Sequence, residues 1–115
     1  MQRLKRWWNG RHARRENARR ERFVSYALSI VKNCHPRNFT LLWKDGGLLG
    51  SVDGPQGTLH RDGFTAKWRF TRTQIGWQGT MRCGEVAADG TIVMFVTYDL
   101  RYADAGALYI LRRTT

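Results

Sequence analysis

The sequence predicts an α+β domain in which one N-terminal helix packs on a curved antiparallel sheet of five to seven strands. The sheet is expected to be a β-meander or a small, partly open barrel. An apolar stripe with helical spacing occupies the first third of the chain. Beyond Pro36, short β-rich segments alternate with turn signals that contain Asp and Gly. The length of 115 residues suits a single hydrophobic core, so we expect one folded domain.

The predicted helix is defined by apolar residues between positions 23 and 34, which recur close to i, i+4, i+7 and i+8. Side chains at this spacing share one face, and we expect that face to pack on the sheet. Pro36 ends the helix, because the residue before a proline is displaced from helical backbone angles. Toward the N-terminus the stripe stops at Phe23, although the helix continues back through residues 11–22. The residues expected to contact the sheet are Phe23, Val24, Ala27, Leu28 and Val31.

The strands are predicted between recurring turn signals such as Asp45-Gly46-Gly47 and Asp62-Gly63. The run 91–98 is apolar on both faces, so we expect it inside the sheet with the helix covering one side. The last segment, 103–113, also fits a helix, but a strand is favoured. The expected strands are residues 39–44, 48–52, 57–61, 64–72, 75–83, 91–100 and 107–113.

One hairpin can be aligned by its alternating side chains. With Thr73-Gln74 as the turn, Phe70 would pair with Trp77 and Trp68 with Gly79, which gathers the apolar residues on one face. Thr-Gln is an unusual two-residue turn, and Gly76 offers a bulge instead.

The charge of the chain is unusually positive and unevenly distributed. The formal net charge is +11, and residues 1–33 carry +8 of it. Arginine outnumbers lysine sixteen to four. Arginine binds phosphate and guanine with two parallel hydrogen bonds and stacks on bases, so this balance favours a nucleic-acid partner. A GC-rich coding sequence would enrich arginine as well.

The segment RHARRENARRER (residues 11–22) carries the strongest functional signal. On a helix its arginines point in several directions, so they can contact both walls of a nucleic-acid groove, and Asn17 can meet a base edge. This segment resembles the arginine-rich RNA-binding peptides of viral and phage regulators, which fold as helices in a widened RNA groove. The resemblance implies RNA binding by Arg14, Arg15, Asn17, Arg19, Arg20 and Arg22. The alternative is a solvated helix whose charges are balanced by Glu16–Arg20 and Glu21 pairs.

Two further groups of residues extend this interpretation. Arg11 continues the tract, and Asn9-Gly10 before it predicts a turn. The N-terminal residues Lys5, Arg6, Trp7 and Trp8 combine cations with indoles. These indoles could stack on unpaired bases, enter a membrane interface or cap the sheet. A secondary basic face is expected on the sheet, and a solvated sheet face would have the same composition; its residues are Lys67, Arg69, Arg72 and Arg82.

Other classes of site receive little support from the sequence. Cys34 and Cys83 are far apart and suit two free thiols in a reducing cytoplasm. We expect no metal and no cofactor, because neither a zinc-ligand spacing nor a phosphate-binding loop is present. No apolar run approaches the roughly 20 residues of a membrane span. A ribonuclease would have to use groups that no motif brings together: His12, His35, His60, Glu85, Arg61 and Arg82.

The sequence therefore predicts a cytoplasmic, non-catalytic protein that binds nucleic acid, RNA rather than DNA. Residues 1–22 would form a basic arm and the exposed half of the helix, and residues 23–115 the α+β domain. An interaction, inhibitor or coat-like protein is the alternative, with the arm bound to an acidic protein, a ribonucleoprotein or packaged genome and the chain in a homo-oligomer. A small toxin-like ribonuclease is the third option.

Overall fold

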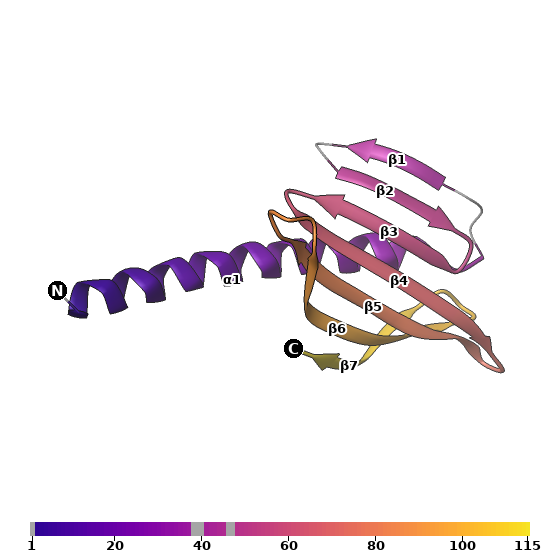
Figure 1. The fold of residues 1–115 in the computed structure, drawn as a ribbon. Coiled ribbons are helices and arrows are strands. Elements are labelled where there is room, and N and C mark those ends of the chain that lie inside the picture. Colours follow the sequence, from indigo (N-terminus) through magenta and orange to yellow (C-terminus); the bar gives the residue numbers. More distant parts are fainter. Residues whose placement is uncertain (1, 38–40, 46–47) are drawn as a thin grey trace.

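The computed structural model describes residues 2–37, 41–45 and 48–115, with side chains placed in 13–37, at 44 and in 49–115. It contains one helix followed by seven strands (Figure 1). The helix α1 spans Gln2–Asn33. The strands are β1 (Leu41–Asp45), β2 (Leu48–Asp53), β3 (Gln56–Arg61), β4 (Phe64–Thr73), β5 (Gly76–Val86), β6 (Ile92–Ala103) and β7 (Leu108–Thr114).

The seven strands form one antiparallel sheet in which chain order and spatial order are the same, β1 to β7. Every strand therefore pairs with its neighbour in sequence, as in a meander. The sheet is open, with β1 and β7 at its two edges. The predicted α+β class with an N-terminal helix is confirmed, and the last segment is a strand, as favoured. The expected turn Asp45-Gly46-Gly47 and the start of the first strand lie partly outside the described residues.

The helix is attached to the sheet through its C-terminal half only. That half crosses one face of the sheet and packs against β4, while the N-terminal half extends beyond the sheet (Figure 1). The molecule is accordingly elongated, with dimensions of 60 × 28 × 22 Å. No helix in the described part of the chain combines the length and apolar character that a membrane crossing requires.

The two ends of α1 compare differently with the prediction. Its C-terminal end agrees: the helix stops at Asn33, shortly before Pro36. Its N-terminal end differs, because Asn9-Gly10 is helical instead of forming a turn. A glycine inside a helix costs only about 1 kcal/mol relative to alanine, so good helix formers on both sides can override this signal.

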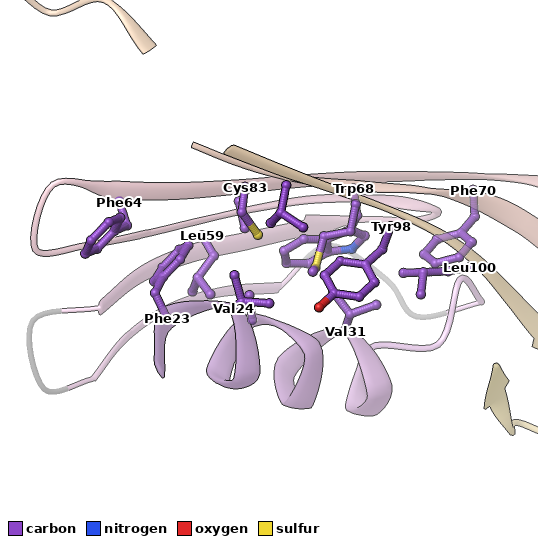
Figure 2. Packing of buried hydrophobic residues seen from close by; sticks show 14 of the residues in the cluster. Phe23, Val24, Val31, Leu59, Phe64, Trp68, Phe70, Cys83, Tyr98 and Leu100 are labelled. Atoms are coloured by element: carbon purple, nitrogen blue, oxygen red, sulfur yellow. The ribbon is translucent and has the colours of Figure 1, made fainter. Parts of the chain in front are cut away.

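The core lies between α1 and the inner face of the sheet, which is the face toward the helix. Phe23, Val24 and Val31 point from the helix into this layer (Figure 2), and Ala27 is buried with them. Leu28 is only partly buried at the margin. The predicted contact face of the helix is thus the observed one. The sheet contributes Val52, Leu59, Phe64, Ala66, Trp68, Phe70, Met81, Cys83, Val96, Tyr98, Leu100 and Tyr102.

The register of the β4–β5 hairpin differs from the prediction by two residues. Phe70 pairs with Gly79 and Trp68 with Met81, and the turn lies at residues 74–75. Gly76 takes part in the ladder with φ +154°, and a side chain there would collide with the Tyr102 carbonyl. A shift of two residues leaves every side chain on its predicted face, so the side-chain alternation could not reveal the error.

On the inner face of the sheet, a glycine of β3 lies opposite a tryptophan of β4. Gly57 pairs directly with Trp68, and the indole covers the glycine backbone. A Cβ atom added to Gly57 would lie 2.1 Å from the indole ring. The glycine thus provides the room that lets Trp68 lie flat in the core, where it is 3% exposed.

Two irregularities interrupt the otherwise regular ladders. The β5–β6 register shifts after Cys83, which leaves Phe95 as an extra residue in β6. The β6–β7 register shifts after Asp99, which leaves Leu111 as an extra residue in β7. An extra residue on one strand is a β-bulge, and the ring of Phe95 is turned toward the inner face, where it meets Phe64 edge-on at 6.0 Å.

The buried thiol of Cys83 makes stability sensitive to alkaline pH. Burial raises its pKa to about 12, and burial also raises the pKa of Tyr102. An unfolded thiol ionises near pKa 8.5, so above about pH 9 the folded state holds a proton that the unfolded state releases. We expect Cys83 to leave the free energy of unfolding unchanged below that pH. Between about pH 9 and 12 it should fall by about 1.4 kcal/mol per pH unit for Cys83 alone.

Urea titrations followed by circular dichroism at about pH 7.5 and about pH 10.5 measure this effect. Cys83→Ala should reduce the loss of stability between the two pH values without abolishing it, because Tyr102 contributes in the same direction. Equal unfolding midpoints at the two pH values would contradict the expectation.

Candidate nucleic-acid interface

Three arginines of the arm point into solvent without an acidic partner. Arg14, Arg15 and Arg22 are exposed, and the described part of the chain provides none of them with an ion pair. Asn17 is exposed as well. No acidic side chain in the described part of the chain therefore offsets the charge of these three arginines. The side chains of Lys5, Arg6, Trp7, Trp8 and Arg11 lie outside the described residues.

Two arginines of the same tract belong to the contact between helix and sheet. Arg19 pairs with Glu16 at 2.8 Å, and its guanidinium lies 5.2 Å from the centre of the Phe64 ring. Arg20 pairs with Glu85 at 3.2 Å and lies 5.3 Å from the Phe95 ring. A guanidinium over the face of an aromatic ring makes a cation–π interaction. Both arginines therefore stabilise the packing of the helix on the sheet. The apolar stripe of the helix begins at Phe23, but the contact between helix and sheet already includes Arg19 and Arg20.

The arm's second glutamate is also engaged by the sheet. Glu21 accepts two hydrogen bonds from Arg113 of β7, one of them at 3.1 Å. Arg113 donates in addition to the hydroxyl of Tyr98 at 3.0 Å. The hydrogen bond from Arg113 lowers the pKa of Glu21. Because Glu16 and Glu21 both have partners, neither neutralises Arg14, Arg15 or Arg22.

A groove lies beside the helix on the flank that faces the β3–β4 turn. Its volume is about 850 Å³, within the range of roughly 300–1,000 Å³ that is usual for ligand sites. Arg61 reaches into it from the end of β3 and lies 5.5 Å from the centre of the Tyr26 ring. The groove is lined by Ala18, Arg19, Glu21, Arg22, Phe23, Ser25, Tyr26, Arg61, Asp62 and Phe64.

The helix contributes a regular stripe of side chains to this groove. Arg15, Arg19, Arg22 and Tyr26 follow one another at i, i+4, i+7 and i+11, so they share one flank of α1. Arg19, Arg22 and Tyr26 line the groove, and Arg15 continues the stripe one turn toward the N-terminal half of the helix. Arg61 is the only described basic residue outside α1 that lines the groove. It brings a cation from β3 to the arginines of the helix.

The predicted secondary basic face is divided between the two sides of the sheet. Lys67 pairs with Arg82, and Arg69 pairs with Thr80 beside them, so the three cations share the outer face, away from the helix. All three are exposed around a depression of about 610 Å³. Arg72 lies on the other side, where it pairs with Asp104 and covers the Trp77 ring at 5.6 Å.

The groups that a ribonuclease would use do not converge among the described residues. His60 pairs with Thr65 and Glu85 pairs with Phe64, and because neighbouring residues of β4 alternate, the two groups lie on opposite faces. His35 lies at the far end of α1, near Tyr102. The side chain of His12 lies outside the described residues.

The possible metal ligands and the two cysteines are the other groups whose positions bear on a reactive site. Within the parts of the chain with placed side chains, no three His, Cys, Asp or Glu residues come together as metal ligands. Cys34 and Cys83 are free thiols. Burial raises the pKa of both, which keeps them protonated and weakly nucleophilic.

The fold and this surface define a small α+β protein whose cationic helix projects from an open antiparallel sheet. No protein-family model, curated protein or solved structure matches the chain. Tyr26 and Arg61 line the groove although neither was expected at this surface from the sequence. The i, i+4, i+7, i+11 spacing from Arg15 was a usable signal for Tyr26, whereas Arg61 had none, because only the folded chain brings it to the helix.

Proposed function

We propose that this protein binds nucleic acid, RNA in preference to DNA, through the arginine-rich helix without catalysing a reaction. The observation that carries the proposal is a set of three cations, Arg14, Arg15 and Arg22, that have no acidic partner among the described residues and lie on a helix that extends beyond the sheet. Like charges within about three turns repel one another and destabilise a solvated helix. A polyanion removes this repulsion and gains from the release of its counterions.

The arm suits a nucleic-acid groove that surrounds a helix. Arg14 lies roughly 100° around the helix axis from Arg15, so the two point in different directions and can contact different phosphates of a groove that encloses the helix. The segment also resembles arginine-rich peptides that enter a widened RNA groove. The preference for RNA rests on that resemblance. Two free thiols fit the reducing cytoplasm, which is where we place this function.

The test is a binding titration with a labelled RNA hairpin and a DNA duplex of the same sequence, followed by fluorescence anisotropy. Combined Arg14→Ala, Arg15→Ala and Arg22→Ala should weaken RNA binding by on the order of 100-fold at moderate salt. The slope of log affinity against log salt should become shallower by about 2 to 3, because about 0.7–0.9 units are lost for each phosphate contact.

A control with the same change in charge separates a specific arm from general attraction. Combined Lys32→Ala, Lys44→Ala and Arg112→Ala removes three exposed cations away from the arm. This control should bind RNA within a few-fold of the natural sequence. Equal losses in the two triple variants, or tighter binding to the DNA duplex, would refute the proposal as stated.

A second candidate function, a coat-like protein that assembles through its sheet, is favoured by one observation. Edge strand β7 exposes Tyr109, Ile110 and Leu111, each about half accessible. Exposed apolar residues on an unpaired strand edge are a surface for pairing with another chain. Light scattering of the purified protein distinguishes a monomer from such an assembly.

A further inference from the structure

The groove beside α1 has features that the arginine-rich helix alone does not explain. A helix inserted into an RNA groove needs only cations and a polar base reader. Here the stripe of arginines ends at an aromatic ring, Tyr26, and that ring faces a guanidinium from another element, Arg61. Tyrosine and arginine planes are the surfaces on which proteins stack unpaired bases.

The charges in the groove leave its cationic side available. Of its two acidic residues, Glu21 is held by Arg113, and Asp62 is a turn residue whose side chain is 74% exposed. Arg61 approaches Asp62 only at 3.5 Å, through its Nε atom. Arg22 has no acidic partner among the described residues, so a phosphate entering the groove would meet at least one uncompensated guanidinium.

We propose that this groove binds an unpaired nucleotide of the RNA, with the base stacked on the Tyr26–Arg61 pair and the adjoining phosphate held by Arg22. This inference rests on the proposed function and specifies its substrate as a hairpin with an unpaired nucleotide beside the stem. Between Arg22 and Arg15 the helix rises about 10 Å, at 1.5 Å per residue. At about 3.4 Å per stacked nucleotide, that length matches about three successive nucleotides of one strand.

The site combines two recognition modes in one continuous path. The part of α1 beyond the sheet would contact the paired stem, and the groove at the domain would receive the base that leaves the stem. The aromatic part discriminates between paired and unpaired nucleotides, because a base within a stem cannot stack on a side chain. The cationic part supplies affinity for either form.

The experiment compares two RNA hairpins, one fully paired and one with a single bulged 2-aminopurine whose fluorescence is quenched on stacking. Natural-sequence protein should quench this fluorescence on binding. Tyr26→Leu, which keeps an apolar side chain but removes the flat ring, should weaken binding to the bulged hairpin by about 5- to 100-fold and abolish quenching. Its affinity for the fully paired hairpin should be unchanged.

Two further variants separate stacking from charge and from folding. Tyr26→Phe keeps the ring and should behave as the natural sequence. Arg61→Lys keeps the charge but not the plane, so it should lose quenching while the salt dependence stays the same. The inference is overturned if Tyr26→Leu binds both hairpins as the natural sequence does, or loses equal affinity for both. If the natural protein binds neither hairpin, the proposed function itself is wrong, and this inference falls with it.

Discussion

Replacement of Phe23 by alanine is expected to lower the free energy of unfolding by about 3–5 kcal/mol. Phe23 is 5% exposed and stacks on Phe64 of β4 at 5.3 Å between ring centres. Among the described side chains of α1 it is the first apolar one that is buried in the core (Figure 2). The cavity would open at the rim of the core, beneath Arg19, so the cation–ring contact of Arg19 with Phe64 should weaken as well.

Urea unfolding followed by circular dichroism measures the effect of this change. Ser25→Ala is the matched control, because it is an exposed position on the same helix and alanine is a good helix former. That control should change stability by less than about 0.5 kcal/mol. A Phe23→Ala variant as stable as the Ser25→Ala variant would show that the helix is not anchored through this ring.

Trp68→Ala should destabilise the protein by a similar amount, about 3–5 kcal/mol, for a reason that involves its partner strand. The indole fills the space over Gly57, so its removal opens a cavity on both β3 and β4. Gly57→Ala in the natural sequence should also destabilise the fold, because the new methyl group meets the indole ring. Overpacking of this kind costs about 1–3 kcal/mol.

The double variant tests whether both effects have one cause. In the Trp68→Ala background, Gly57→Ala adds a methyl group to an empty space, so it should be neutral or stabilising. The two changes should therefore be strongly non-additive, with a coupling energy of at least about 1 kcal/mol. Additive losses in a double-mutant cycle would mean that the indole and Gly57 do not share this space in solution.

The overall architecture could be predicted because its signals are local. The spacing of apolar residues identified the packed half of α1, and Asp-Gly signals divided the rest into seven segments close to the observed strands. Register was harder, since alternation determines only which face a residue occupies. The β4–β5 pairing could move by two residues without placing Phe70 or Trp68 on the wrong side. The position of the turn depended on Gly76, whose backbone approaches the carbonyl of Tyr102 in the next strand, β6.

The candidate site was predictable to the extent that charge is visible in the sequence. Arg14, Arg15 and Arg22 are exposed, and their role in binding stays a prediction. The partners of Glu16, Arg20 and Glu21 were not predictable, because two of them involve β5 and β7, about 65 and 92 residues away in sequence. Helical spacing suggested Arg20 as the partner of Glu16, but the structure gives Arg19 that role and turns Arg20 toward Glu85.

The bulge at Leu111 determines which single-residue deletion in β7 is compatible with the fold during evolution. Deletion of any other residue of β7 before Arg113 would move each following side chain to the opposite face of the sheet. It would also separate Arg113 from Glu21. Loss of Leu111 alone removes the extra residue, so Ile110 stays opposite Leu100 and Arg112 stays opposite Asp99. Strand β7 thus contains one position at which a residue can be deleted while Arg113 remains aligned with Glu21 of the helix.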